Sequence, residues 1–453
     1  MADLGRVRAL FAASLGFHIV FATLGVGLPL MIALAEIVAH HRRDPVYRLI
    51  ARRWAAAFIV LLGTGVVSGT IVAMQLQLLW PAFMRLVGQL IAVPFAIEVV
   101  AFFIEAVFAA IYLYAGDRLR PGWRIFSALL VAVGAGGSAL LITDVNAFMN
   151  TPTGFHLVNG RLTDIHPWQA VFNPAMPTEI SHVIVTAYLA VALVLAAFAA
   201  AGALRAKSAG EMAYRKRELA ITTSVAAIMA VLAAVTGDLA AKFLAAYQPV
   251  KLAAAEGLFQ TTAGAAINVG GLADAATDQV RGGINIPGLL SWLATGSSHG
   301  VVQGLQTVPP SLWPPVAATH LLFDGMVGIG ILALVFSLAH LLTQRRPRPW
   351  VLGALVAMGP LGMLGIESGW IFAELARQPW TITGVLTTAQ AVTPQPSAGA
   401  FLIPFLLLYV VLSIGAVAAL RAQMRQQPPG EAAVGGPAAP PHGIGHGKVV
   451  AEP

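Results

Sequence analysis

Apolar runs of roughly 20 residues recur along the whole length of this 453-residue chain. Each run is long enough to cross about 30 Å of hydrocarbon as a helix. The chain is 58% hydrophobic and only 10% charged, whereas soluble domains carry about 25% charged residues. Because lipid cannot satisfy exposed backbone groups, spanning segments of this kind are helical. The sequence therefore predicts an all-α integral membrane protein.

We expect a bundle of about nine transmembrane helices in four regions of the chain. The first region, residues 1–240, holds six spans, and residues 241–316 form an outer loop too long to be a mere connection. Residues 317–420 hold the last three spans, and the Pro-, Gly- and Ala-rich residues 421–453 are predicted to be a disordered tail. The nine expected spans are 12–38, 55–79, 91–115, 125–149, 179–203, 219–240, 317–342, 350–374 and 399–420.

The basic residues alternate between the two ends of the predicted helices. Of the 27 Lys and Arg residues, 19 fall on one side. They lie in the segments Arg42–Arg53, Arg118–Arg124, Arg205–Arg217, Arg345–Arg348 and the tail from Arg421. The positive-inside rule places that side in the cytoplasm, so the N-terminus is expected outside and the C-terminus inside. Orientation also accounts for the net charge of +7, and we expect no nucleic-acid partner.

Two carboxylates, Glu98 and Glu105, share the third predicted span and lie seven residues apart. In a helix they point within roughly 20° of each other, about 10 Å apart along the axis. Carboxyl chains relay protons in membranes, so a proton path is one interpretation. The alternative is that both groups simply hydrogen-bond to neighbouring helices.

A second polar stripe lies at the end of the eighth predicted span and contains Glu367, Trp370, Glu374 and Arg377. Ionisable groups at this depth are costly and usually functional, which favours contact with a buried charged cofactor. For Arg377 alone, the alternative is that its head group reaches the lipid head groups.

Histidine is scarce inside the predicted spans. His18 lies in the first span and His182 in the fifth, and Met326 lies at a depth similar to that of His182. Haem iron takes His, or a His/Met pair, as axial ligands, although a lone membrane histidine or methionine is more often a packing or hydrogen-bonding residue. A haem–copper oxidase needs more buried histidines than this chain offers, and the absence of Cys excludes thiolate-ligated metal.

With these residues in view, residues 6–420 resemble subunit I of the cytochrome bd quinol oxidases. The resemblance depends on several motifs in the right order. These are the His18 span, Gly65–Thr70, Pro94–Glu98, Phe102–Glu105, Gly116–Leu119, Asn173-Pro174 with His182, Lys251–Glu256, Phe323–Met326 and the segment from Glu367 to Trp380.

The resemblance implies cofactors and a ligand for each of them. His182 and Met326 correspond to the axial pair of a low-spin haem b. His18 corresponds to a ligand of one high-spin haem, and Glu374 or Glu98 to the ligand of the other. The two high-spin groups are a second haem b and either haem d or a third haem b. Which of them each ligand holds is left open.

The other matched residues have implied roles in catalysis. Glu98 and Glu105 serve the oxygen site, and Arg377 and Trp370 lie near the haems. Lys251 and Glu256 belong to the outer loop where quinol is oxidised. A base such as Glu256 suits this reaction because quinol releases protons together with electrons.

The resemblance implies a bd-type quinol oxidase without copper in the bacterial cytoplasmic (inner) membrane, which reduces O2 to water and builds a proton-motive force. It also implies a second large membrane subunit, subunit II, and leaves room for a small single-span subunit. The alternatives are a haem-free ion transporter or channel, and a membrane cytochrome b with an acceptor other than oxygen.

Three features depart from the best-known family members. Glu98 and Glu105 are seven rather than eight residues apart, Asp324 stands where many members have Arg, and the quinol loop is short. These details resemble the cyanide-insensitive branch of the family.

Overall fold

The computed structural model describes residues 4–426. Within that part of the chain, nine helices are long and apolar enough to cross a membrane, as predicted. They are α1 (Leu4–Arg42), α2 (Pro45–Leu79), α4 (Ala92–Ala110), α5 (Pro121–Asn150), α7 (Met176–Leu204), α8 (Ala209–Tyr247), α11 (Val316–Thr343), α12 (Pro349–Leu375) and α14 (Leu402–Gln426). Helix α4 continues into a π-helical turn, η1 (Ile111–Ala115). The expected disordered tail, residues 427–453, lies outside the described residues.

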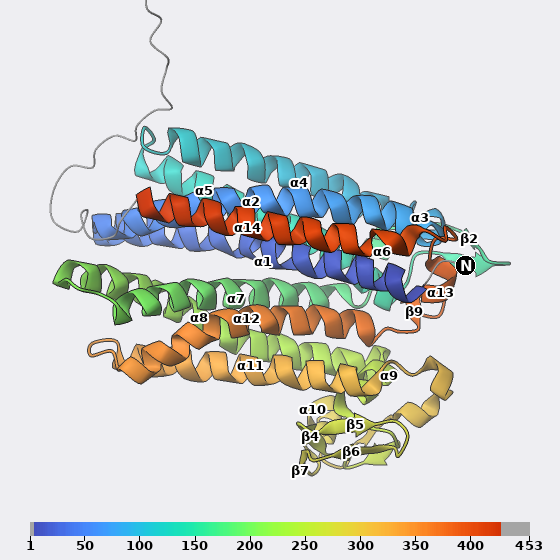
Figure 1. The fold of residues 1–453 in the computed structure, drawn as a ribbon. Helices are drawn as coiled ribbons and strands as arrows, with labels where there is room; N and C mark the ends of the chain where they lie inside the picture. Colours follow the sequence, from blue (N-terminus) through green and yellow to red (C-terminus); the bar gives the residue numbers. More distant parts are fainter. Residues whose placement is uncertain (1–3, 427–453) are drawn as a thin grey trace, which may run out of the picture.

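The long helices run side by side in two groups (Figure 1). Helices α1, α2, α4 and α5 form one group, with α14 packed on α1 and α2. Helices α7, α8, α11 and α12 form the other group, drawn green to orange in Figure 1. Helix α1 also packs against α7, so it joins the two groups.

Glycines let the helices approach one another closely. A Cβ atom built on Gly27 of α1 would lie 2.4 Å from Cγ2 of Val191 on α7. One built on Gly134 of α5 would lie 2.7 Å from the backbone nitrogen of Glu105 on α4. Small residues at such crossings allow the backbone contact that stabilises helix pairs in membranes. The second crossing fixes the height of Glu105 against α5.

Several helices extend beyond the predicted spans. Helix α8 begins at Ala209, where the side chain of Ser208 accepts a hydrogen bond from the backbone N–H of Glu211 at 3.1 Å. Arg215 and Arg217 therefore lie in the helix, not in the basic loop that the sequence suggested. The predicted span was only as long as the hydrocarbon is thick. A helix can extend into water beyond that length when a capping residue bonds to the backbone N–H groups at its end.

The basic loops meet at one end of the molecule. Asp117, after η1, pairs with both Arg48 and Arg52 of α2. Asp44, before α2, accepts a bond of 2.6 Å from Nε of Arg217 on α8. The loops that follow α1, α4 and α7 are therefore neighbours at this basic end.

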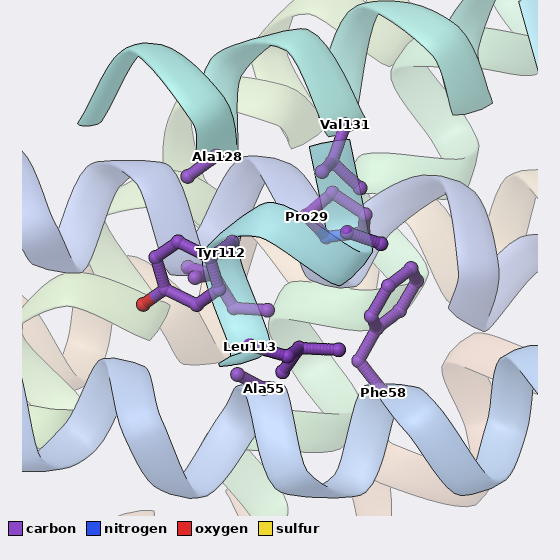
Figure 2. Close-up of a pocket in the computed structure, with 9 residues that line it drawn as sticks. Pro29, Ala55, Phe58, Tyr112, Leu113, Ala128 and Val131 are labelled. Atoms are coloured by element: carbon purple, nitrogen blue, oxygen red, sulfur yellow. The ribbon is translucent and has the colours of Figure 1, made fainter. Parts of the chain in front are cut away.

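A small apolar pocket of about 10 Å³ lies where α1, α2, α5 and η1 meet (Figure 2). Pro29, Phe58, Tyr112 and Val131 are among its lining residues. Because a cavity needs about 10–15 Å³ to hold a single water molecule, this is a packing gap and not a cofactor site.

The opposite end of the bundle carries short elements (Figure 1). The short helices are α3 (Pro81–Val87), α6 (Pro167–Val171), α9 (Pro249–Glu256), α10 (Leu289–Thr295) and α13 (Thr388–Ala391). The strands form antiparallel pairs: β1 (His156–Val158) with β2 (Arg161–Thr163), β3 (Thr262–Ala263) with β8 (Val301–Val302), β4 (Ile267–Val269) with β7 (Ile284–Ile286), β5 (Leu272–Asp274) with β6 (Gln279–Arg281), and β9 (Trp380–Ile382) with β10 (Leu386–Thr387). The long outer loop is thus folded into helices and hairpins.

Candidate functional site

His18 of α1 lies against α2 with its ring orientation fixed. Its Nδ1 atom is 3.0 Å from Oγ of Ser68, and that hydroxyl donates its own proton to the carbonyl of Gly65 at 3.0 Å. With the Ser68 hydroxyl directed to Gly65, Nδ1 of His18 is assigned as the donor in this pair, because a hydroxyl has only one proton. Nε2 therefore keeps its lone pair, which is the arrangement of a metal-binding imidazole. A Cβ atom on Gly69 would lie 2.9 Å from the ring, so glycine makes room for it.

His182 of α7 has the same arrangement against α8. Its Nδ1 atom is 3.0 Å from Oγ1 of Thr236, which donates to the carbonyl of Leu232 at 2.9 Å. Nε2 of His182 again keeps a free lone pair. Gly237 leaves space beside the ring, since a Cβ atom there would lie 3.4 Å from Cε1 of His182.

Met326 of α11 faces a gap in the surface of α12. A Cβ atom on Gly369 would lie 3.1 Å from its sulfur. The rings of Phe323 and Phe372 pack one turn away, with centroids 5.4 Å apart. Helices α7, α8, α11 and α12 form one group, so the His182 and Met326 helices belong to the same bundle.

Glu374, near the end of α12, is held by two partners. Nη2 of Arg377 donates to its Oε2 at 2.6 Å, and Nδ2 of Asn146 on α5 donates to its Oε1. The side chain is still 34% exposed. Each oxygen has a further lone pair, so the carboxylate can bind a metal while these two bonds hold it in place.

Arg377 is buried, with only 5% of its surface exposed. Within residues 4–426, its Nε and Nη1 atoms have no hydrogen-bond partner. Buried donors of this kind are normally satisfied. Two unused guanidinium donors beside Glu374 fit an anionic group such as a haem propionate, for which the fork geometry of arginine is well suited.

Trp370 and Glu367 connect α12 with the neighbourhood of His18. Trp370 packs in a cluster that includes Ile19, the residue after His18. Oε2 of Glu367 approaches α1 so closely that a Cβ atom on Gly16 would lie 3.4 Å from it. The predicted stripe on α12 thus splits: Glu367 and Trp370 face α1, and Glu374 faces α5.

Of the two carboxylates of α4, that of Glu98 bonds to α5, and the backbone at Glu105 lies against α5. Oγ of Ser138 donates to Oε1 of Glu98 at 2.8 Å. Glu105 is buried beside Gly134. The interhelical bond expected under the simpler interpretation is therefore present at Glu98.

Lys251 and Glu256 point to different places, because five residues on α9 correspond to a rotation of about 140°. Nζ of Lys251 donates to Oδ1 of Asn150 on α5 at 3.2 Å and lies 5.7 Å from the ring centroid of Phe372. Burial lowers the pKa of Lys251 to about 8, although Glu179 and Glu374 act in the opposite direction.

Glu256 ends α9 on the side of α11. Burial, followed by the charge of Asp324, raises the pKa of Glu256 to about 8. Nδ1 of His320 lies 2.7 Å from the carbonyl of Ala255, the preceding residue, and Nε2 lies 3.5 Å from Asp324. His320 therefore ties the end of α9 to α11, the helix that carries Met326.

Comparison with known proteins identifies the family. Residues 7–428 match the model of cytochrome bd terminal oxidase subunit I. The chain belongs to this family. It is 42% identical over 435 residues to the Bacillus subtilis protein whose assigned name is cytochrome bd menaquinol oxidase subunit I, covering 94% of this chain and 98% of that one. The B. subtilis cytochrome bd ubiquinol oxidase subunit 1 is 31% identical over 430 residues, covering 91% of each chain.

The bd oxidase of Geobacillus thermodenitrificans has the same fold. One of its chains superposes with a TM-score of 0.88 at 42% identity, covering 94% of this chain and 99% of that chain. The chain is thus a haem-bearing quinol oxidase subunit of the bd type, which works with a subunit II. It is a multi-pass protein of the bacterial cytoplasmic membrane. Neither alternative, the haem-free transporter or the cytochrome b with another acceptor, is supported by these relatives.

Five polar residues of this candidate site were given no individual role from the sequence. They are Ser68, Asn146, Asn150, Thr236 and His320. Asn146 and Asn150 are four residues apart at the end of an expected span, a spacing that places both on one helix face. That spacing was the only signal for the pair. Ser and Thr are ordinary in membrane helices, and nothing in the sequence marks Ser68 and Thr236 as partners of histidines.

Proposed function

We propose that His182 and Met326 are the axial ligands of a low-spin haem b, and that His18 and Glu374 each hold a high-spin haem. One of these is haem b, and the other is haem d or a third haem b. The observation that carries the proposal is the shared arrangement of the two histidines. In each, Nδ1–H is committed to a helix hydroxyl and Nε2 is left free, as second-shell control of a haem ligand requires.

Haem held at these residues would supply the one-electron chemistry that the reduction of O2 needs. The surrounding residues position the cofactors. Arg377 offers two buried, unused donors to an acid group, and its third nitrogen holds Glu374. Trp370 extends from α12 and packs in a cluster with Ile19 of α1, next to His18. Glycines at positions 69, 237 and 369 keep the space beside each ligand open.

Quinol is the electron donor, and Glu256 and Lys251 serve its oxidation at the end of the bundle opposite to the basic loops. Glu256 in its ionised form accepts a proton from a quinol hydroxyl, and burial raises its pKa to about 8, which makes it a stronger base than an ordinary carboxylate. Because Lys251 faces α5 and not Glu256, its charge acts on the site from the other side of α9.

Protons for water formation enter from the basic end through Glu98 and Glu105. Support comes from the bond between Ser138 and Glu98 and from the burial of Glu105. The positive-inside rule makes the basic end cytoplasmic, so the C-terminus is inside and the N-terminus outside. Proton uptake inside and release outside then build the proton-motive force. A small single-span subunit beside subunit II completes the proposed complex.

Replacement of single ligands in the purified complex tests the assignment. H182A or M326A should abolish the low-spin haem signal and spare the high-spin signals, and H18A should do the reverse. Retention of the low-spin signal in H182A would remove the axial-pair assignment. Oxygen consumption with added quinol in the wild-type complex should be lost in each variant.

A further inference from the structure

Two asparagines of α5 connect the outer-loop lysine to Glu374. Nζ of Lys251 donates to Oδ1 of Asn150 at 3.2 Å. Nδ2 of Asn150 donates to Oδ1 of Asn146 at 3.1 Å, and Nδ2 of Asn146 donates to Oε1 of Glu374. The chain of bonds therefore runs without interruption from an ammonium on α9 to a carboxylate on α12.

The orientation of both amides follows from the chemistry of the two ends. An ammonium only donates, so the atom of Asn150 that faces Lys251 is its oxygen. An ionised carboxylate only accepts, so the atom of Asn146 that faces Glu374 is its nitrogen. Both amides consequently point the same way, with their oxygens toward the cation and their N–H groups toward the anion. Aligned hydrogen bonds polarise one another.

Burial strengthens the effect of this chain. Lys251 and Asn150 are both almost fully buried, and electrostatic interactions are stronger away from water. Nδ2 of Asn150 has two further acceptors, Oε1 of Glu179 on α7 at 2.9 Å and the backbone carbonyl of Asn146 at 3.1 Å. Glu179 therefore shares the donor of Asn150 but does not interrupt the chain toward Glu374.

We propose that Asn146 and Asn150 are positioning residues that transmit the charge of Lys251 to Glu374, so that events in the quinol loop adjust the haem that Glu374 holds. This inference rests on the proposed function, since it takes Glu374 as a haem ligand. Amide groups are poor proton carriers, so the chain acts by polarisation and orientation. A positive charge at one end strengthens the N–H bond to Glu374 and makes the carboxylate a weaker donor to iron.

A double-mutant cycle on the complete complex tests the coupling. K251M and N150L are combined, and the midpoint potential and optical spectrum of the high-spin haems are measured at pH 6.5, where Lys251 carries its charge. K251M should lower the potential of the Glu374-held haem, because a carboxylate relieved of that pull stabilises ferric iron. N150L should lower it similarly, and the double variant should show no further drop.

Controls separate charge from structure. K251R keeps the charge and a donor, so it should restore most of the potential. K242M removes an exposed lysine that pairs with Asp238 at 2.6 Å on α8, and it should leave the potential unchanged. If N150L does not assemble, N150S takes its place, since the shorter hydroxyl cannot span the gap.

Equal shifts from K251M in the wild-type and N150L backgrounds would overturn the inference, because the charge would then act through space. No shift from either variant would overturn it as well. The proposed function fails separately: E374A retaining every haem would show that Glu374 is no ligand, whatever the cycle gives.

Discussion

Nδ1 of His182 lies 3.0 Å from Oγ1 of Thr236, and that hydroxyl donates its proton to the carbonyl of Leu232. With its proton directed to that carbonyl, the hydroxyl is assigned as the acceptor from the imidazole. The pair fixes the tautomer on α7 from a residue on α8, 54 positions away.

This relationship predicts the effect of T236V, which keeps the shape of the side chain and removes the acceptor. Loss of a second-shell partner typically costs about 10–100-fold in metal affinity, so low-spin haem should be lost while the protein still folds. Haem content and the low-spin optical band measure the effect. T222V changes another buried threonine of α8 and should keep the low-spin band. Equal haem loss in both variants would contradict the assigned role.

The contact between Gly369 and Met326 predicts a second effect. In G369V the new side chain meets the sulfur, because even a Cβ atom would lie 3.1 Å from it. Overpacking of this kind costs about 1–3 kcal/mol, and displacement of Met326 should remove the low-spin band. G353V on the same helix has open space around the new Cβ and serves as the control. A normal low-spin spectrum in G369V would argue against Met326 as a ligand.

The environment of Glu256 predicts a pH dependence. Burial and Asp324 raise the pKa of Glu256 to about 8, with His320 also on the α11 side. The ionised form accepts the quinol proton, so turnover should rise as pH increases through about 8, and E256Q should remove this rise. Steady-state quinol oxidation from pH 6 to 9 measures it. Haem content should be unchanged in E256Q; its loss would make the residue structural.

The same raised pKa has a consequence for stability. The folded protein holds the Glu256 proton up to about pH 8, whereas the unfolded chain releases it near the ordinary glutamate pKa of 4.5. The folded state therefore binds more protons in this window, and stability falls as pH rises from about 4.5 to 8. E256Q should flatten that decline in thermal unfolding of the complex. A slope equal to that of the wild type would contradict the raised pKa.

The contacts of Arg377 predict that lysine cannot replace arginine at this position. R377K keeps the positive charge but removes the planar guanidinium. In Arg377, Nη2 bonds to Glu374, and Nε and Nη1 remain available for an acid group. Arginine and lysine are not interchangeable at such sites. We expect R377K to lose high-spin haem, measured by extraction, while the low-spin haem stays. R281K, in an exposed hairpin, is the matched control.

The candidate ligands that the sequence indicated are residues whose types are rare in membranes. His18, His182 and Glu374 stand out because polar groups in spans are costly. Ser68 and Thr236 could not be predicted, because the choice of partner depends on how α1 meets α2 and how α7 meets α8. The same holds for Asn146, because it and its partner Glu374 are 228 positions apart in the sequence.

The spans were predictable for a similar physical reason, since hydrocarbon thickness sets a minimum apolar length. The outer loop was not, because its strands have only two or three residues and are too short to show alternation. The sequence also did not show that Lys251 and Glu256 point in different directions, because this depends on both residues lying on one short helix.

The most direct test of the account is extraction and counting of haem from the purified complex of this chain with its subunit II. Three haems per chain are expected, with one removed by H182A and a different one by E374A. A colourless wild-type complex from cells with ample porphyrin, or unchanged haem counts in both variants, would contradict the claim that these side chains hold haem.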